Sequence, residues 1–405
     1  QSLLDEFSKF LLDPALVDQV RLRPGAFTRD RHLTLPRIAA MMMSGMCASV
    51  QAELDTLFGQ LKGLAVRSRE VSAQAFSKAR KGFSAELFRL AGRHLLALAQ
   101  PQIDAARWNG LRVVAADASR LRVSTRANAK LSADHYAFAL FLPGAELTLH
   151  ASLHPADGSE RQMLFEALDE LDAGRDLLVL DRGYVGNTMV ASLAQRGLGF
   201  CLRADTRGWR CVADFLRAGA SEQVVTLAAP RAAEASIYEI QAIPTTVRLI
   251  RDVTPSGNIR VLMTNLLDAR RYPAEQFGAL YHRRWRVEEA FKRIKHRLRL
   301  EAPSGLNYLA FQQDFAAKVL ADNLSQLLSA ETEPPDATSR PNRTYAQGAL
   351  KPILAGCLLA LEHARNHLQT VLDAIACNHC RVQPERSYPR PRRVKPHQHL
   401  AYKGA

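Results

Sequence analysis

The chain has 405 residues, 47% of them hydrophobic and 23% charged, which excludes a disordered polyelectrolyte and allows two or three domains with their own cores. Charges at Asp5, Glu6 and Lys9 exclude a typical signal peptide, and no uncharged run reaches the roughly 18 residues of a membrane span. We therefore expect a cytoplasmic protein. The net charge of +14 favours a polyanionic partner such as DNA, although an anionic lipid surface or an acidic protein also fits it.

The first hundred residues have a helical pattern. Thr34 can cap a helix that has Pro36 in its first turn, and a second helix is expected from Val50 to Leu61. A further helix pair is predicted over 71–80 and 84–98. Two interpretations stay open for this pair, a helix-turn-helix module with basic residues at its turn or a helical bundle with ordinary exposed charge. The first interpretation gives a helical DNA-binding domain over 1–105.

An α/β pattern follows, in which apolar, strand-like runs alternate with amphipathic helices. Strands are predicted over 111–116, 137–142, 147–153, 177–180 and 199–203, with helices over 159–171 and 187–196. We assign residues 106–330 to one mixed α/β catalytic domain. Short β-like runs at 222–227, 236–242 and 247–252 predict a β-rich insertion at about 205–265.

The rest of the chain is mainly helical, with helices expected over 273–299 and 308–328. Three prolines mark a linker at 331–341. The last part, 343–405, is expected to form a helical region with a basic tail, which has seven basic residues against one acidic residue from Arg381 onward.

The cysteines are too few and too irregularly spaced for a disulfide framework. Two interpretations exist for Cys377 and Cys380. They could bind zinc together with the preceding His363 and His367, or they could be plain thiols. The reversed ligand order and the helix-like segment between the two pairs favour plain thiols.

Two carboxylates come directly after apolar, strand-like runs. Asp117 follows Leu-Arg-Val-Val-Ala-Ala, and Asp181 follows Leu-Leu-Val-Leu. A carboxylate at the end of a buried strand is costly unless it meets water, a metal or a cation. An aspartate in such a position is more often a turn residue than a catalytic one. A catalytic role for the two aspartates therefore needs support from a further carboxylate.

The segment Tyr281–Lys295 supplies such a carboxylate. At about 100° per residue of a continuous helix, Tyr281, Arg284, Glu288 and Lys295 lie on one narrow stripe beside an apolar face. A solvent-exposed face with an Arg–Glu pair four residues apart is the alternative. Carboxylates that converge on Mg²⁺ are what two-metal phosphoryl transfer requires, and nearby cations can hold phosphates.

These motifs together resemble the bacterial DDE transposases of the insertion-sequence-four type, whose catalytic core is ribonuclease-H-like. The family signature is Tyr, two residues, Arg, three residues, Glu, six residues, Lys, and residues 281–295 match every spacing. Ala-Ala-Asp117 and Leu-Asp181-Arg-Gly-Tyr match the two aspartate motifs. Further similar segments are Phe76-Ser-Lys-Ala-Arg80, Phe311-Gln-Gln-Asp-Phe315 and Tyr388-Pro-Arg390. The implied fold is α/β, with a ribonuclease-H-like mixed sheet, flanking helices, a β-rich insertion and helical regions at both ends.

The resemblance implies that Asp117, Asp181 and Glu288 are catalytic and bind Mg²⁺, with Mn²⁺ able to substitute. Three further residues are implied to contact DNA at the end of the element, namely Tyr281, Arg284 and Lys295. Some relatives insert a tryptophan beside a flipped base, but no motif aligns Trp209 with that residue.

The implied function is cut-and-paste transposition of an insertion sequence. The enzyme would bind terminal inverted repeats, hydrolyse a strand at each end and join the ends to target DNA. We expect a homodimer in the synaptic complex, because two ends must react together, and a bacterial cytoplasmic protein that associates with the nucleoid when bound to DNA. Two alternatives stay open: a ribonuclease-H-like nuclease without strand transfer, and a sequence-specific DNA-binding protein that has lost catalysis.

Overall fold

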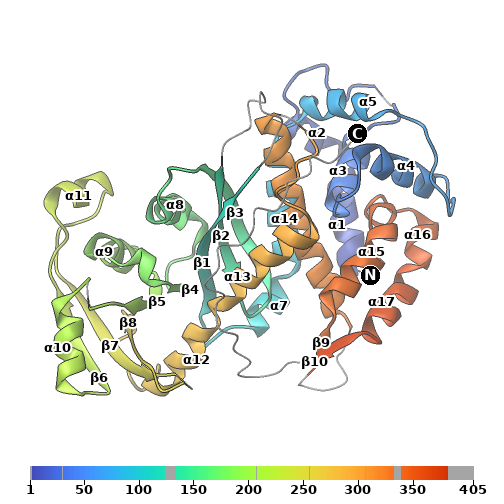
Figure 1. Ribbon diagram of the computed structural model, residues 1–405. Coiled ribbons are helices and arrows are strands. Elements are labelled where there is room, and N and C mark those ends of the chain that lie inside the picture. The colour runs from blue at the N-terminus through green and yellow to red at the C-terminus, as the bar shows by residue number, and fades with distance from the viewer. Residues whose placement is uncertain are drawn as a thin grey trace. The chain divides into compact units, whose positions relative to one another are not determined.

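The computed structural model describes residues 2–29, 31–123, 134–206, 208–254, 256–305, 307–332 and 339–381. The chain divides into two compact units (Figure 1). Unit 1 comprises 1–100, 121–135 and 292–405, and unit 2 comprises 101–120 and 136–291. The tail after Arg381, the motif Tyr388-Pro-Arg390 and residues 333–338 of the predicted linker lie outside the described residues. The domain boundaries given above stay a prediction. None of the described helices has the length and apolar character that a membrane crossing needs.

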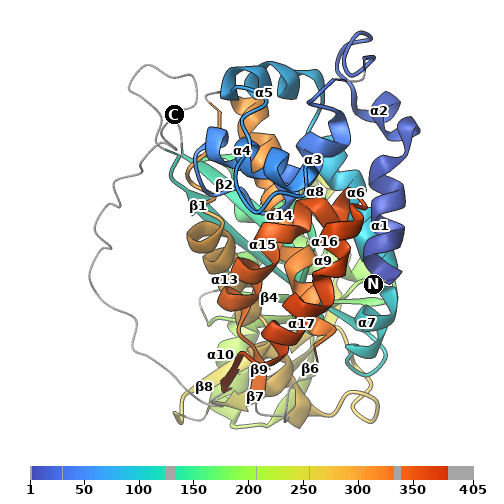
Figure 2. The same cartoon turned by 90° about the vertical axis from the view of Figure 1, so that its right-hand side faces the viewer.

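Unit 1 is helical, with segments from both ends of the chain in one core. Its α-helices are α1 (Ser2–Leu12), α2 (Pro14–Val20), α3 (Leu35–Met43), α4 (Val50–Leu61), α5 (Ala73–Ala79), α6 (Glu86–Leu98), α14 (Tyr308–Ala330), α15 (Arg343–Leu358), α16 (Glu362–Asn366) and α17 (Leu368–Ala376). A 3₁₀ turn, η1 (Arg80–Gly82), a π-helical turn, η5 (Arg293–Arg297), and a small antiparallel pair of strands, β9 (Ser339–Pro341) and β10 (His379–Arg381), complete it. Helix α14 packs against α3, α6 and α15, and α15 also packs against α1, α3 and α4 (Figure 2).

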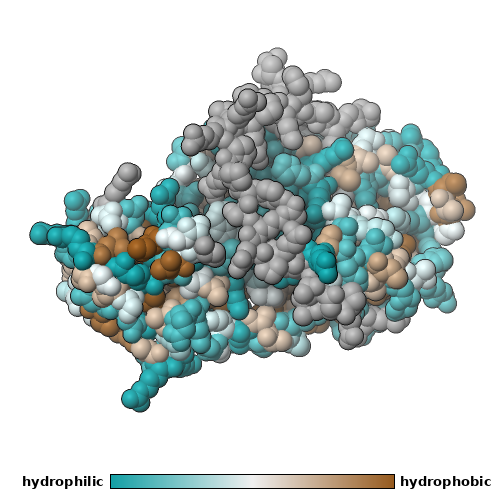
Figure 3. Space-filling model, turned by 60° about the horizontal axis from the view of Figure 1, so that its bottom comes forward, coloured by the Kyte–Doolittle hydropathy of each residue, from teal (hydrophilic) through white to brown (hydrophobic). Residues whose placement is uncertain are grey.

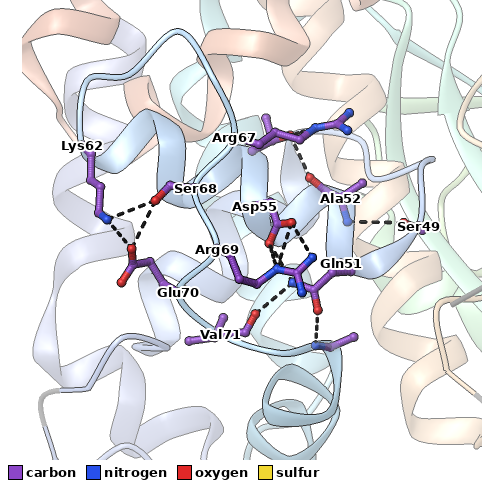
Figure 4. A network of polar contacts seen from close by, with 12 residues as sticks. Ser49, Gln51, Ala52, Asp55, Lys62, Arg67, Ser68, Arg69, Glu70 and Val71 are labelled. Carbon is purple, nitrogen blue, oxygen red and sulfur yellow. Dashed lines mark hydrogen bonds and ion pairs between the residues drawn. The ribbon is translucent and has the colours of Figure 1, made fainter.

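The N-terminal helices begin where the sequence predicts. The Thr34 side chain accepts a hydrogen bond from the Arg37 N–H, and α4 has the predicted bounds, with Ser49 as its cap. The chain after α4 then folds back onto that helix (Figure 4). There, Arg69 pairs with Asp55, and Gln51 donates to the Val71 carbonyl at 2.9 Å and accepts from the Ala73 N–H. These polar contacts fix the approach to α5.

A buried polar network joins α5 and α14 in the two segments Phe76–Arg80 and Phe311–Phe315. The guanidinium of Arg80, 3% exposed, donates to Gln313 at 2.9 Å, to Ser304 at 2.7 Å and to Asp314 at 3.0 Å. All three partners are buried as well. Arg80 therefore holds unit 1 together, so of the basic residues at the predicted helix-turn-helix turn only Lys78 and Lys81 are exposed.

Unit 2 is built on one eight-stranded mixed sheet in the order β3-β2-β1-β4-β5-β8-β7-β6 (Figure 1, green to yellow). Its strands are β1 (Arg112–Leu121), β2 (His135–Leu142), β3 (Leu147–Pro155), β4 (Asp176–Leu180), β5 (Gly199–Ala204), β6 (Glu222–Leu227), β7 (Thr245–Val253) and β8 (Ile259–Thr264). The strands β1, β4 and β5 are parallel, and the β5–β8, β8–β7 and β7–β6 pairs are antiparallel. The predicted α/β class, with a mixed sheet and flanking helices, is confirmed.

The centre of this sheet is buried on both faces, as parallel strands require. All five residues of β4 are buried. The one cation in the predicted first strand, Arg112, is neutralised by buried Asp176 on the neighbouring strand through two hydrogen bonds of 2.6 Å. The flanking helices are α7 (Gln100–Ala105), α8 (Glu160–Ala167), α9 (Asn187–Gln195), α10 (Arg210–Ala218), α11 (Ala232–Ile237), α12 (Phe277–His282) and α13 (Trp285–Lys292), with 3₁₀ turns η2 (Leu168–Glu170), η3 (Arg182–Tyr184) and η4 (Ala274–Gln276).

The region 205–265 adds its strands β6, β7 and β8 to the same sheet and also contains two helices. The strand predicted over 236–242 is wrong, because the alanine-rich start of α11 has high helix propensity and carries the helix through Ile237. Glu239 then has φ = 53°, which an extended strand does not allow. The face drawn in Figure 3 is mainly hydrophilic and carries hydrophobic areas, and several apolar side chains of this region are exposed, namely Val224, Ile237, Ile243, Val253 and Ile259.

The helix predicted over 273–299 is broken into η4, α12, α13 and η5. Between α12 and α13, the N–H groups of Arg283 and Arg284 bond to the carbonyls of Leu280 and Tyr281, three residues back, instead of four. This tight turn separates α12 from α13. The stripe calculated for one continuous helix is therefore not the actual geometry.

Candidate active site

The register of the sheet brings the two predicted aspartates side by side. Ala115 of β1 is opposite Val179 of β4, and the two strands are parallel. Asp117 and Asp181 each come two residues later, so they continue the same register on the same face. The strand β1 extends to Leu121, so Asp117 lies within it and not at its end, whereas Asp181 directly follows β4.

Asp181 is held by the turn that it starts. It is the N-cap of η3, and its Oδ1 accepts the Arg182 N–H at 2.7 Å. The hydroxyl of Tyr281 lies 3.5 Å from the same oxygen, which is a long contact. The main-chain bond fixes the direction of the carboxylate, and this is what a metal ligand needs.

Glu288 lies in the first turn of α13, where it pairs with Arg284. The two are joined by a 3.0 Å contact from Nη2 of Arg284 to Oε1 of Glu288. The guanidinium of Arg284 is buried, whereas the side chain of Glu288 is 24% exposed and that of Glu289 is exposed. Only Glu288 of the two adjacent glutamates therefore faces the buried cation.

The charges of these residues act on the carboxyl group of Asp117 and change its pKa. Burial raises the pKa of Asp117 to about 7, the guanidinium of Arg284 opposes that rise, and the carboxylates of Glu160, Glu288 and Asp181 add to it. An aspartate is affected in this way only where these groups are its neighbours. The structure thus brings Asp117, Asp181, Glu288 and Arg284 of unit 2 into one electrostatic cluster.

Tyr281 is buried in the core at the edge of this cluster. Only 3% of it is exposed, and the guanidinium of Arg260 lies over its ring at 4.8 Å from the centroid. Burial, with the charge of Asp181, raises the pKa of the phenol to about 12, so Tyr281 stays protonated. Its predicted contact with DNA stays a prediction.

Lys295, the last residue of the predicted stripe, belongs to unit 1, in η5. Its Nζ lies 4.0 Å from Glu301 Oε1. The contact of Lys295 with DNA also stays a prediction.

Trp209 is buried at the start of α10, and its indole N–H donates to Asn187 at 2.5 Å.

Sequence reasoning missed two residues of the cluster, Glu160 and Tyr184. Glu160 is the first residue of α8, directly after the third strand, and it influences the pKa of Asp117. Tyr184 ends the motif Asp-Arg-Gly-Tyr and is completely buried. The sequence does contain a signal for each residue. Glu160 is an acid in the first turn of the helix after β3, and Tyr184 is the tyrosine of the quoted motif. Neither signal shows how close the residue lies to Asp117.

No group of three or more His, Cys, Asp and Glu residues within the described ranges is gathered closely enough to form a ready metal site. The oxygen donors of the cluster are nevertheless of the hard type that Mg²⁺ prefers. Cys377 and Cys380 are exposed thiols, and the ring of His363 bonds to the Gln60 carbonyl at 2.7 Å.

A comparison with known families decides the identity of the chain. The transposase DDE domain family matches residues 108–324, which is more than half of the chain and includes all six predicted site residues. The chain belongs to this family.

The DDE transposase is therefore an enzyme that catalyses phosphoryl transfer on DNA. Members of this family generally use divalent metal ions. Among solved structures, it is similar to a piggyBac transposase in a synaptic complex with hairpin DNA, with 12% identity and a TM-score of 0.45 over 91% of this chain and 85% of that chain. No curated protein sequence matches this transposase.

Proposed function

We propose that this transposase moves an insertion sequence by cut-and-paste transposition, as a bacterial enzyme of the insertion-sequence-four type. It binds the terminal inverted repeats, hydrolyses the strand at each end and joins the 3′-hydroxyl ends to target DNA. Asp117, Asp181 and Glu288 are the catalytic carboxylates. The single observation that carries this proposal is the convergence of these three acids with Arg284 in unit 2.

The donor set fits Mg²⁺, with Mn²⁺ able to replace it. The three carboxylates supply hard oxygen atoms. Burial, and then the neighbouring carboxylates, raise the pKa of Asp117 to about 7, and a divalent cation would favour its charged form. When bound, such ions activate the attacking water or 3′-hydroxyl and stabilise the leaving oxygen. Asp181 is pre-oriented for this role by the Arg182 N–H, which occupies one of its oxygens and leaves the other open.

Arg284 can serve both the carboxylates and the DNA. One face of its guanidinium bonds to Glu288, while its Nε is buried and has no hydrogen-bond partner within the described residues. An unpaired N–H in a guanidinium is a donor for a phosphate oxygen, with the charge assistance that guanidinium–phosphate contacts have. We assign DNA contact to Arg284, Tyr281 and Lys295.

Two protomers act in one complex in this proposal, because two DNA ends must react together and each site holds one end. The net charge of +14 disfavours association of free monomers, and DNA phosphates screen that repulsion. The homodimer therefore forms on DNA, in the bacterial cytoplasm and at the nucleoid.

The test uses the purified full chain, Mg²⁺ and a DNA fragment that ends in the inverted repeat of its own element. We expect strand cleavage at the end of the repeat, followed by joined products. Cleavage without joining would support the nuclease alternative, and specific binding without cleavage would support the inactive DNA-binding protein.

The matched pair Glu288→Gln and Glu289→Gln tests the assignment of the third acid. Loss of a metal ligand should reduce cleavage by more than the roughly 10²–10³-fold that one hydrogen-bond donor contributes, with DNA binding retained. The adjacent Glu289, which is exposed, should be dispensable. A Glu288→Gln enzyme that cleaves at a near-normal rate would mean that the triad is misassigned.

A further inference from the structure

The first turn of α8 is fastened to the turn that follows Asp181. Arg161 donates from Nε to the Gly183 carbonyl at 2.9 Å. Its neighbour Glu160 faces the same turn, since its Oε2 lies 3.7 Å from the position that a Cβ on Gly183 would occupy. This is an ordinary contact distance, so the carboxylate lies against the turn, and Gly183 is only two residues from Asp181. The carboxylate of Glu160 is thereby placed on the chain segment that carries a catalytic acid.

Glu160 also interacts electrostatically with the acids of the cluster. Burial, and then the charge of Asp181, raise the pKa of Glu160, and Glu160 itself contributes to the raised pKa of Asp117. A glutamate that only stabilised the start of a helix would have the opposite shift, because the positive end of the helix dipole favours its charged form. The observed direction comes first from burial and then from the charge of Asp181, so Glu160 is a half-buried acid beside another carboxylate.

A second, independent observation concerns Tyr184, on the same turn. This residue is completely buried, and its hydroxyl has no hydrogen-bond partner within the described ranges. Burial, followed by the charges of Glu160 and Asp117, raises its pKa well above the ordinary value, so the phenol keeps its proton. A buried O–H donor without a partner is costly, and this donor is close to the carboxylates. Together with the unpaired Nε of Arg284, it indicates that a polar ligand belongs among these groups.

We infer that Glu160 is a fourth metal-binding carboxylate of the active site, next to Asp181. This inference rests on the proposed function. With Glu160 included, the acids Asp117, Asp181, Glu288 and Glu160 outnumber the single buried cation Arg284 by three charges. Two divalent cations reverse that excess and leave the site positive, which suits a phosphodiester. In this arrangement Tyr184 would be a positioning residue, because its buried hydroxyl could donate to an oxygen atom bound at the site.

The test measures Mn²⁺ uptake by the full chain, with electron paramagnetic resonance of the free ion as the readout. Three variants are compared with the unaltered protein: Glu160→Gln, Asp181→Asn and the control Glu166→Gln. Glu166 lies on the same helix and is exposed. We expect Glu160→Gln to weaken Mn²⁺ binding by about tenfold or more, as loss of a metal-site group does, and Glu166→Gln to leave it unchanged.

Metal-free stability separates a ligand from a merely structural residue. Because Glu160 adds to the crowding of negative charge, Glu160→Gln should leave the thermal midpoint in a chelator at or above that of the unaltered protein. A lower midpoint with unchanged Mn²⁺ affinity would overturn the inference and make Glu160 a structural anchor of α8. If Asp181→Asn weakens Mn²⁺ binding and Glu160→Gln does not, the inference fails and the proposed function stands. If the unaltered protein takes up no Mn²⁺ at millimolar concentration, the metal site as a whole is overturned.

Discussion

Asp117→Asn should abolish cleavage and at the same time stabilise the metal-free protein at neutral pH. The physical reason is the crowding at this position, where burial and three neighbouring carboxylates raise the pKa from 3.8 to about 7. Asparagine keeps the shape of the side chain and removes the charge. The same substitution thus has opposite effects on function and on stability, which is typical of a residue that is kept for its chemistry.

The magnitude follows from the shift. Because the folded-state pKa is above the unfolded-state value, folding favours the protonated form. The resulting stabilisation is fully present below about pH 3.8 and is lost as the pH rises through about 7. At about 1.36 kcal/mol per pKa unit, the full effect is roughly 4 kcal/mol, and roughly 3 kcal/mol of it falls between about pH 5 and pH 8.

The assay is urea unfolding in a metal chelator at several pH values, with the free energy of unfolding compared between the variant and the unaltered protein. The advantage of Asp117→Asn should grow by roughly 3 kcal/mol from about pH 5 to pH 8. Asp169→Asn, at a side chain that is 87% exposed, is the control and should show no such trend. A difference that stays constant over this range would refute the crowding at Asp117. Saturating Mg²⁺ should reverse the order, because only the unaltered protein keeps all its ligands.

Three further predictions address DNA contact, the core of unit 1 and assembly. Arg284→Ala and Lys295→Ala should each weaken binding about equally for all DNA sequences and lower the salt slope by about one, and an unchanged slope for both would place them away from phosphates. Asp314→Ala should lower the free energy of unfolding by roughly 3–5 kcal/mol, because it leaves buried Arg80 without its counter-charge; a loss below about 1 kcal/mol in urea unfolding would contradict that. Light scattering should find a monomer without DNA and two protomers on paired DNA ends, and a stable dimer without DNA would contradict the charge argument.

Much of the fold could be predicted because its elements have strong local signals. Thr34 and Ser49 cap helices that begin where expected, and the apolar run before Asp181 forms a completely buried strand. The pairing of β1 with β4 could not be predicted in the same way. It joins residues more than 60 positions apart, and only its register places Asp117 beside Asp181.

The elements that were wrong depend on contacts that local patterns do not contain. The segment 236–242 alternates enough to look like a strand, but the alanines before it start a helix and Glu239 takes a positive φ. Glu160 was missed for a different reason, since its role depends on its closeness to Gly183, on a different element.

The break between α12 and α13 shows why a correct motif can have an incorrect geometric explanation. A continuous helix would place Arg284 and Glu288 on one stripe. The two residues do pair, because Arg284 directly precedes α13 and Glu288 follows it by four residues. The structure adds that the side chain of Arg284 is buried, at 3% exposed. A guanidinium in that position offsets carboxylates that would otherwise repel each other when no metal is bound. The spacing of Arg and Glu in the signature is thus explained by a buried counter-charge more directly than by a helical stripe. Residues on the two sides of the turn thus contact two of the three acids, since the hydroxyl of Tyr281 lies 3.5 Å from Oδ1 of Asp181 and Arg284 pairs with Glu288.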